Sequence, residues 1–286
     1  MLNDWHFKKG LLKISAANYE HMLSPVTKDW FLVSSPWPVL GIVLCYLFFC
    51  MKLGPYFMSN KKPYELKTAI KLYNIFQVLI SSYLVYEGFL YVFHKDYSFK
   101  CQAPDHDDSP RSVRIARNIY IYFALKIIEL LDTIFFVLRK SYRQVSSLHL
   151  HHHSLMPLAS WIAIKYIPGG QGVLVGWVNS FVHVIMYGYY LISGLGPQYK
   201  KYLWWKKYVT VLQLVQFAFI FCHSVTSLFF SCGYPTTIKY LTIVYSVVFM
   251  NMFGRFYYQN YVKPKAPAKK IEKNGVKNGV KKSRTE

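Results

Sequence analysis

The chain is poor in charged side chains, above all in acidic ones. Charged residues make up 16% of its 286 positions, and only 13 Asp and Glu accompany 34 Lys and Arg. Together with a hydrophobic share of 53% and a mean hydropathy of +0.17, this excludes an ordinary soluble domain and is typical of a polytopic membrane protein. The net charge of +21 does not indicate nucleic-acid binding, because the basic residues lie in short loops and the tail rather than along one face interleaved with aromatics.

The first 32 residues lack a compact apolar core followed by a small-residue cleavage site, so we expect no removed signal peptide. Seven later segments have about 20 mostly apolar residues, which is the length that crosses a hydrocarbon core of ~30 Å. They are residues 33–53, 68–92, 115–138, 146–166, 171–193, 208–230 and 236–258. Histidines lower the hydropathy of the fourth, so a re-entrant segment there is the alternative.

Basic residues set the expected orientation, because short cytoplasmic loops retain positive charge. The loops after the first, third and fifth segments are rich in Lys and Arg, whereas the others are balanced by Asp or nearly bare. We therefore predict a lumenal N-terminal segment over residues 1–32, a seven-helix domain over 33–261 and a disordered basic cytoplasmic tail over 262–286. Near its end, Lys282 and Arg284 are placed like an endoplasmic reticulum retrieval signal, and a basic tail attracted to anionic lipid is the alternative.

Cysteine is scarce too, with five residues in the chain. Cys45, Cys50 and Cys222 lie within apolar segments, but Cys101 and Cys232 fall in two different loops on the predicted lumenal side. Because that compartment is oxidising, we predict a Cys101–Cys232 disulfide, with two free lumenal thiols as the alternative.

Four histidines stand within five positions in LHLHHHS, residues 148–154. On a helix, a rotation of 100° per residue places His149, His152 and His153 on one face and turns His151 to the opposite side. Polar rings at membrane depth cost free energy unless they pair or face a cavity. The sequence therefore predicts a functional site around this face.

The third segment contains KIIELLDT, in which Lys126, Glu129, Asp132 and Thr133 share one stripe of a helix. Each ionisable residue costs roughly 2.5–3.5 kcal/mol at the centre of a lipid-facing helix, so the stripe is expected to face the protein interior. One interpretation is a buried Lys126–Glu129 pair that only fastens helices. The other is a polar wall that holds a phosphate-bearing or carboxylate-bearing substrate, with Lys126 as the cation.

The remaining segments carry polar stripes of the same kind. The fifth has Asn179, His183, Met186, Tyr187 and Tyr190 on one face, the sixth has Thr210, Gln213 and Gln216, and the seventh has Asn251 and Arg255. Polar side chains from five successive segments together indicate an enclosed polar chamber.

Four motifs in series resemble those of the elongases of very-long-chain fatty acids, the 3-oxoacyl-CoA synthases. They are KIIELLDT from Lys126, HLHHH from His149, NSFVHVIMYGYY from Asn179 and TVLQLVQF from Thr210. The similarity runs from about Trp30 to Tyr261. Two positions depart from the pattern: His151 stands where an aromatic residue is usual, and Arg255 stands where Asn is common.

The resemblance implies a seven-helix protein of the endoplasmic reticulum membrane, in which helices two to seven enclose a narrow acyl-chain tunnel. It also implies the condensing step of fatty acid elongation, in which a long-chain acyl-CoA and malonyl-CoA give a 3-oxoacyl-CoA two carbons longer. No cofactor or metal is then expected. The implied partners are membrane lipid and the reductases and dehydratase of the elongation cycle. Chain-length preference and oligomeric state, including a homo-oligomer, stay open.

By the same resemblance His152 is the acylated residue, His183 faces it, and His149 and His153 orient it or transfer protons. A neutral imidazole is the expected nucleophile, because the only cysteine near the polar motifs is Cys222, whose neighbour His223 points about 100° away on a helix. The expected substrate-binding residues are Lys126, Glu129, Asp132, Asn179, Tyr187, Gln213 and Gln216. A ternary-complex mechanism with the histidines as bases would use the same residues.

Two other classes compete with this interpretation. A membrane di-iron desaturase or hydroxylase also uses HxxHH spacing, but it needs several histidine boxes and this chain has one. A seven-segment receptor or transporter without catalysis fits the segment count equally well. A receptor for an apolar ligand has little reason to keep His, Lys, Glu and Asp in one band.

Overall fold

The computed structural model describes residues 24–105 and 107–263. The larger helices are α2 (Pro36–Phe48), α4 (Lys67–Val92), α5 (Pro110–Ile128), α6 (Leu131–Leu138), α7 (Ser147–Tyr166), α8 (Gln171–Gly194), α9 (Lys206–Leu228) and α10 (Thr236–Tyr257). Shorter elements are η1 (Phe49–Leu53), α3 (Gly54–Met58), η2 (Tyr142–Gln144), η3 (Pro197–Tyr202) and η4 (Tyr258–Val262). Most of the predicted N-terminal segment, His106 and the tail with Lys282 and Arg284 lie outside the described residues.

Within the described residues the fold is helical, apart from one isolated bridge between Pro104 and Gly169. Five helical stretches are long and apolar enough to cross a membrane: Pro36–Met58, Lys67–Val92, Gln171–Gly194, Lys206–Leu228 and Thr236–Val262. The prediction of an all-α membrane protein is therefore confirmed. The other two predicted segments also fall on helices, and they carry the ionisable stripe and the histidines.

The third predicted segment, 115–138, differs from the single helix that we expected. It divides into α5 and α6, and the break lies at Glu129 and Leu130. Here the backbone tightens, since the Leu130 and Asp132 amides bond to carbonyls three residues back. α5 also begins at Pro110, earlier than predicted, because the Ser109 hydroxyl accepts from the Ser112 amide and Pro110 occupies the first helical position.

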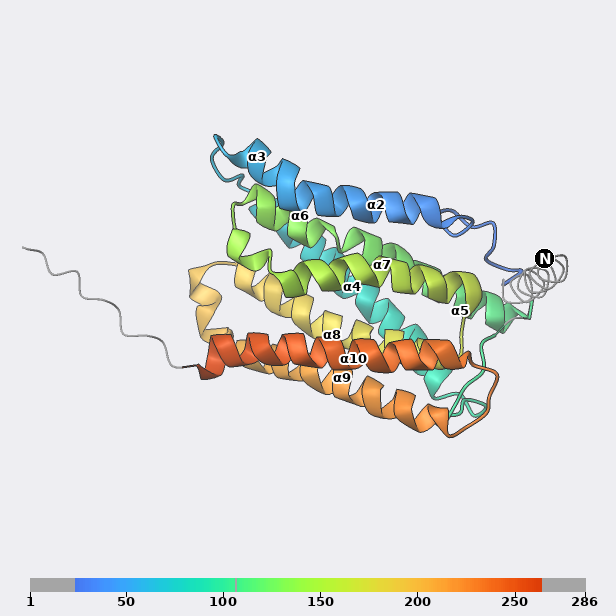
Figure 1. The fold of residues 1–286 in the computed structure, drawn as a ribbon. Helices are drawn as coiled ribbons and strands as arrows, with labels where there is room; N and C mark the ends of the chain where they lie inside the picture. The colour runs from blue at the N-terminus through green and yellow to red at the C-terminus, as the bar shows by residue number, and fades with distance from the viewer. Residues whose placement is uncertain (1–23, 106, 264–286) are drawn as a thin grey trace, which may run out of the picture.

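The long helices run side by side in a bundle (Figure 1). α4 packs on α8, α5 on α7 and α9 on α10, whereas α2 lies at the edge of the bundle against α7. The α4–α8 contact depends on Gly88, because a Cβ at this position would lie 2.5 Å from Cδ1 of Trp177. The Trp177 indole in turn donates to the Val85 carbonyl at 3.0 Å, which fixes the two helices in register.

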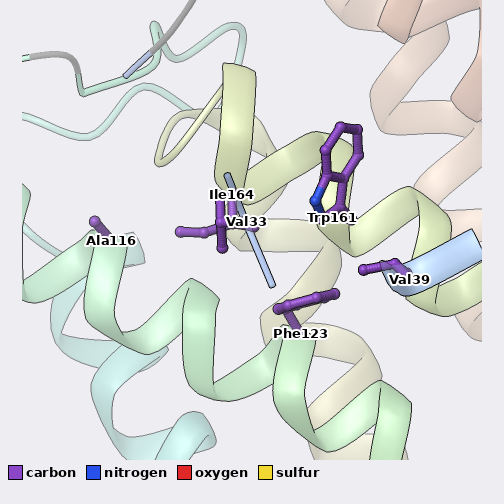
Figure 2. Close-up of a cluster of buried hydrophobic side chains, with 6 residues drawn as sticks. All are labelled: Val33, Val39, Ala116, Phe123, Trp161 and Ile164. Atoms are coloured by element: carbon purple, nitrogen blue, oxygen red, sulfur yellow. The ribbon is translucent and has the colours of Figure 1, made fainter. Parts of the chain in front are cut away.

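The segment before α2 joins α5 and α7 through an apolar cluster (Figure 2). Its buried members are Val33, Val39, Ala116, Phe123, Trp161 and Ile164. Polar contacts reinforce the cluster, since Trp161 Nε1 donates to the Leu32 carbonyl at 3.0 Å and Lys165 Nζ donates to the Ser34 carbonyl at 2.7 Å. This cluster thus holds the N-terminal end of α2 to the bundle, in addition to the contacts that α2 makes with α7 along its length.

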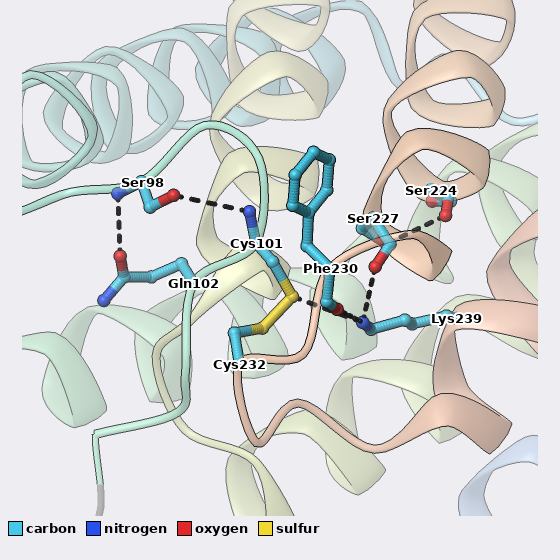
Figure 3. The surroundings of a disulfide bond; sticks show 8 residues. All are labelled: Ser98, Cys101, Gln102, Ser224, Ser227, Phe230, Cys232 and Lys239. Carbon is cyan, nitrogen blue, oxygen red and sulfur yellow. Dashed lines mark hydrogen bonds between the residues drawn. A yellow bond between two sulfur atoms is a disulfide. The ribbon is translucent and has the colours of Figure 1, made fainter.

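A disulfide joins the α4–α5 loop to the α9–α10 loop, between Cys101 and Cys232, the pair that the sequence analysis expected (Figure 3). Their Cα atoms are 5.7 Å apart. Lys239 Nζ lies beside the bond, 3.2 Å from Cys101 Sγ, and donates to the Ser227 carbonyl at 2.7 Å. The two loops, which the charge pattern places on one side of the membrane, therefore meet in space.

Candidate functional site

The histidines are displayed by the first turns of α7. The Ser146 hydroxyl caps this helix by accepting from the His149 amide at 3.2 Å, so the helix begins directly before the histidine motif. The rings of His149 and His153 lie 4.1 Å apart, and those of His152 and His153 lie 5.4 Å apart. His153 is buried and His151 is exposed, as the helical rotation predicts.

A cavity of about 900 Å³ runs between α4, α5, α7, α8, α9 and α10. His152 lines one part of it, together with Asn179, Gln216 and Phe249, whose ring is 5.2 Å from that of His152. Ile167, at the opposite end of α7, lines it as well. At a rise of 1.5 Å per residue, these two lining positions are about 22 Å apart along the helix. The cavity thus has the length and the largely apolar wall that suit an extended hydrocarbon chain.

Three predicted site residues form a buried cluster behind the cavity wall. Lys126 Nζ donates to the two carboxylate oxygens of Glu129 at 2.8 and 3.0 Å, and each of these side chains is 1% exposed. His183 Nδ1 lies 3.1 Å from Glu129 Oε1 and 3.5 Å from Lys126 Nζ. The buried ion pair that the sequence left as one interpretation is therefore present, and its carboxylate also contacts a predicted catalytic histidine.

Neighbouring side chains extend this polar layer. The Tyr187 hydroxyl donates to Asp132 Oδ2 at 2.6 Å, and the Tyr122 hydroxyl donates to Asn179 Oδ1 at 2.9 Å. Lys126 Nζ stands over the Tyr122 ring, 4.7 Å from its centroid. The polar side chains of α5, α6 and α8 thus form hydrogen bonds with one another inside the bundle, as buried polar groups generally do.

The cavity wall divides the predicted residues into two groups. His152, Asn179 and Gln216 line the cavity. The others do not line it: His149, His153, His183, Lys126, Glu129, Asp132, Tyr187 and Gln213. Gln213 Nε2 contacts Met186 Sδ at 3.5 Å rather than the cavity. Among the predicted histidines, His152 alone lines the cavity, with three further histidines and an ion pair near it, while His94 lines the cavity from just beyond the end of α4.

A second polar cluster on the same wall was not predicted from the sequence. Arg114 donates through Nε and Nη2 to both oxygens of Glu87 at 2.8 and 2.7 Å, and Asn118 Nδ2 donates to Glu87 Oε2 at 2.8 Å. All three residues line the cavity. Glu87 is the one acidic residue between 67 and 92 and is therefore conspicuous in the sequence, but Arg114 lies just outside the predicted third segment, in what hydropathy gives as a loop.

The far end of the cavity lies beside the disulfide. Tyr234, in the α9–α10 loop, lines the cavity and packs with Cys101 and Ile167. Burial raises the pKa of the Tyr234 phenol further above physiological pH. Cys222, the thiol considered as a nucleophile, is exposed on α9 and does not line the cavity.

Comparison with known proteins gives a consistent result. Residues 31–269 match the model of the ELO, or GNS1/SUR4, family. A very long chain fatty acid elongase of Aedes aegypti is 43% identical over 238 residues, which cover 83% of this chain and 66% of that protein, just under two thirds of its length. Very long chain fatty acid elongase 7 of Drosophila melanogaster is 41% identical over 258 residues, covering 89% and 78%. Very long chain fatty acid elongase 4 of Homo sapiens is 42% identical over 258 residues, covering 90% and 82%.

Proposed function

This chain belongs to the GNS1/SUR4 family, and we propose that it catalyses the condensing step of fatty acid elongation in the endoplasmic reticulum membrane. It joins a long-chain acyl-CoA to malonyl-CoA and releases a 3-oxoacyl-CoA two carbons longer, carbon dioxide and CoA. The observation that carries this proposal is the position of His152 on the wall of a long apolar cavity. The names of the relatives, all very long chain fatty acid elongases, support the same class of reaction.

The proposed chemistry begins with His152. A ring nitrogen attacks the acyl thioester, the carbon–sulfur bond breaks, and CoA leaves with the imidazole proton. Malonyl-CoA then loses carbon dioxide to give an enolate, which attacks the acyl carbon; the bond from that carbon to the His152 nitrogen breaks, and the released imidazole takes up one proton, the proton that the overall reaction consumes. Asn179 and Gln216 line the same cavity and can donate amide hydrogens to the oxygen that becomes negative.

The contacts of the buried cluster support a role for His183 as a base that serves this nucleophile. Because Glu129 stands 3.1 Å from His183 Nδ1, the carboxylate accepts the proton on that nitrogen. His183 Nε2 is then left with a free lone pair, which suits a proton acceptor. In this proposal Lys126 holds the charge of Glu129 rather than a substrate phosphate, because its hydrogen-bond partners among the described residues, Glu129 and His183, are protein groups.

The membrane arrangement belongs to the same proposal. The chain crosses the membrane seven times, with a lumenal N-terminus and a cytoplasmic C-terminus, and the helices after α2 enclose the acyl chain. The disulfide between the α4–α5 and α9–α10 loops supports this orientation, because a disulfide persists in the oxidising lumen. The product then passes to the reductases and dehydratase of the elongation cycle.

Mass spectrometry after incubation with acyl-CoA alone tests the covalent route. We expect release of free CoA and an acyl adduct on His152, and loss of both in His152→Ala. His151→Ala is the matched control, because His151 is exposed on the other face of α7, and it should keep the adduct. Without CoA release or adduct in the parent protein, a ternary-complex mechanism replaces the covalent one.

Incorporation of labelled malonyl-CoA tests the reaction class itself. The purified protein should make lengthened acyl products, and replacing both His152 and His183 by Ala should abolish them while expression persists. No incorporation by the parent protein would favour a receptor or transporter. Stoichiometric iron in the purified protein would favour the di-iron alternative.

A further inference from the structure

Tyr46 reaches the histidine cluster from a helix that takes no part in the cavity. No residue of α2, which the structure describes in full, lines the cavity. The Tyr46 ring is 4% exposed and packs with Cys50, Leu130 and Val137. Its hydroxyl lies 2.7 Å from Oγ1 of Thr133 on α6. A buried phenol in apolar surroundings needs such a partner.

Thr133 connects this phenol to the histidine motif. Its Oγ1 lies 2.9 Å from His149 Nε2, so one hydroxyl contacts both residues. Thr133 is 0% exposed. A threonine hydroxyl has one proton and two lone pairs, which limits how the three groups can share their protons.

One arrangement of protons satisfies every donor. If Tyr46 donates to Thr133 and Thr133 donates to His149 Nε2, both hydroxyl protons have an acceptor. If His149 Nε2 carries a proton instead, a hydroxyl proton of Tyr46 or of Thr133 is left without an acceptor among the hydrogen bonds of the described residues. Thr133 does not bond to the carbonyl four residues back, as Thr226 and Thr242 do. An unpaired buried donor costs free energy, so the first arrangement is favoured.

We propose that Tyr46 is a positioning residue, which acts through Thr133 to fix the tautomer and the ring orientation of His149. His149 then keeps its proton on Nδ1 and lies against His153, 4.1 Å away, which in turn contacts His152. This inference rests on the proposed function of the histidine cluster. It gives α2 a role in the reaction besides anchoring the chain.

The test uses variants that remove one hydroxyl each. Tyr46→Phe should lower kcat for condensation by about 10-fold, the lower range seen when a group that orients a histidine is removed, and leave KM for acyl-CoA unchanged. Thr133→Val should have the same effect, whereas Thr133→Ser keeps the hydroxyl and should restore activity. In the Thr133→Val background, Tyr46→Phe should not lower kcat further, because the hydrogen bonds from Tyr46 through Thr133 to His149 are already lost.

Tyr97→Phe is the matched control. Tyr97 is also a buried tyrosine, but its hydroxyl has no hydrogen-bond partner in the described structure, so this variant should keep the parent kcat. The inference is overturned if Tyr46→Phe keeps the parent kcat, or if it lowers kcat equally with Thr133 present and absent. A parent protein that makes no lengthened product would instead overturn the proposed function, so the two failures differ.

Discussion

Removing the charge of Glu129 should strongly destabilise the protein. In Glu129→Gln the side chain keeps its size, but Lys126 stays buried with 1% exposure and loses the negative charge and one of the two acceptor oxygens of its partner. An uncompensated buried charge costs about 3–5 kcal/mol. We expect a loss of that size in the free energy of unfolding, measured by denaturant titration in micelles with tryptophan fluorescence. Turnover should fall as well, because His183 Nδ1 loses its carboxylate partner.

A paired replacement separates stability from catalysis. Lys126→Met together with Glu129→Leu removes both charges, and apolar substitutes for a buried ion pair are often neutral or stabilising. The double variant should therefore be more stable than Glu129→Gln and should still be inactive. Its recovery of stability without activity would assign the ion pair to orienting His183 rather than to holding the bundle together.

The exposed pair of Asp96 and Arg111 provides the control. Its side chains are 61% and 40% exposed and 3.6 Å apart, so Asp96→Asn should cost at most about 1 kcal/mol. The reasoning is refuted if Glu129→Gln costs no more than Asp96→Asn. It is also refuted if the double variant loses as much stability as the sum of the losses in Lys126→Met alone and Glu129→Leu alone.

Two further predictions concern the packing of the bundle. Cys101→Ser should lower the free energy of unfolding by about 2–5 kcal/mol, and a reductant should have the same effect on the parent protein. Cys222→Ser, which changes an exposed free thiol, should have no effect. Thermal unfolding measures each of these effects. An unchanged melting temperature for Cys101→Ser would contradict the disulfide. Gly88→Ala should cost about 1–3 kcal/mol, because its Cβ would meet Trp177 at 2.5 Å. A Cβ at Gly188 on α8 would have no neighbour within 4 Å, so Gly188→Ala should be neutral or stabilising. Equal effects of Gly88→Ala and Gly188→Ala would contradict the close α4–α8 packing.

Much of the fold could be predicted from hydropathy, because lipid requires long apolar helices and the sequence shows where they lie. The break between α5 and α6 could not, since residues 125–132 have no Gly or Pro to mark it and the change is a local tightening of hydrogen bonds. The start of α5 could have been found from Ser109 and Pro110, whose capping role is local.

The candidate site was predicted as a set of residues but not as an arrangement. Helical periodicity identified the face of His149, His152 and His153, because rotation per residue is a property of one helix. It could not show that His152 lines the cavity while His149 bonds to Thr133, because that depends on how α7 meets α6 and α10. The Glu87–Arg114 pair was missed for the same reason, since its partners come from two helices.

From the order of residues alone it follows that the chain is an all-α membrane protein, that the polar stripes of its helices face inward, and which family it resembles. Each of these follows from composition, from periodicity within one helix, or from motifs in order along the chain. The packing of the helices was needed to show that Glu129 lies between Lys126 and His183, and that Tyr46 contacts the histidine cluster through Thr133. Such contacts depend on the distance and rotation between packed helices, which no single segment encodes.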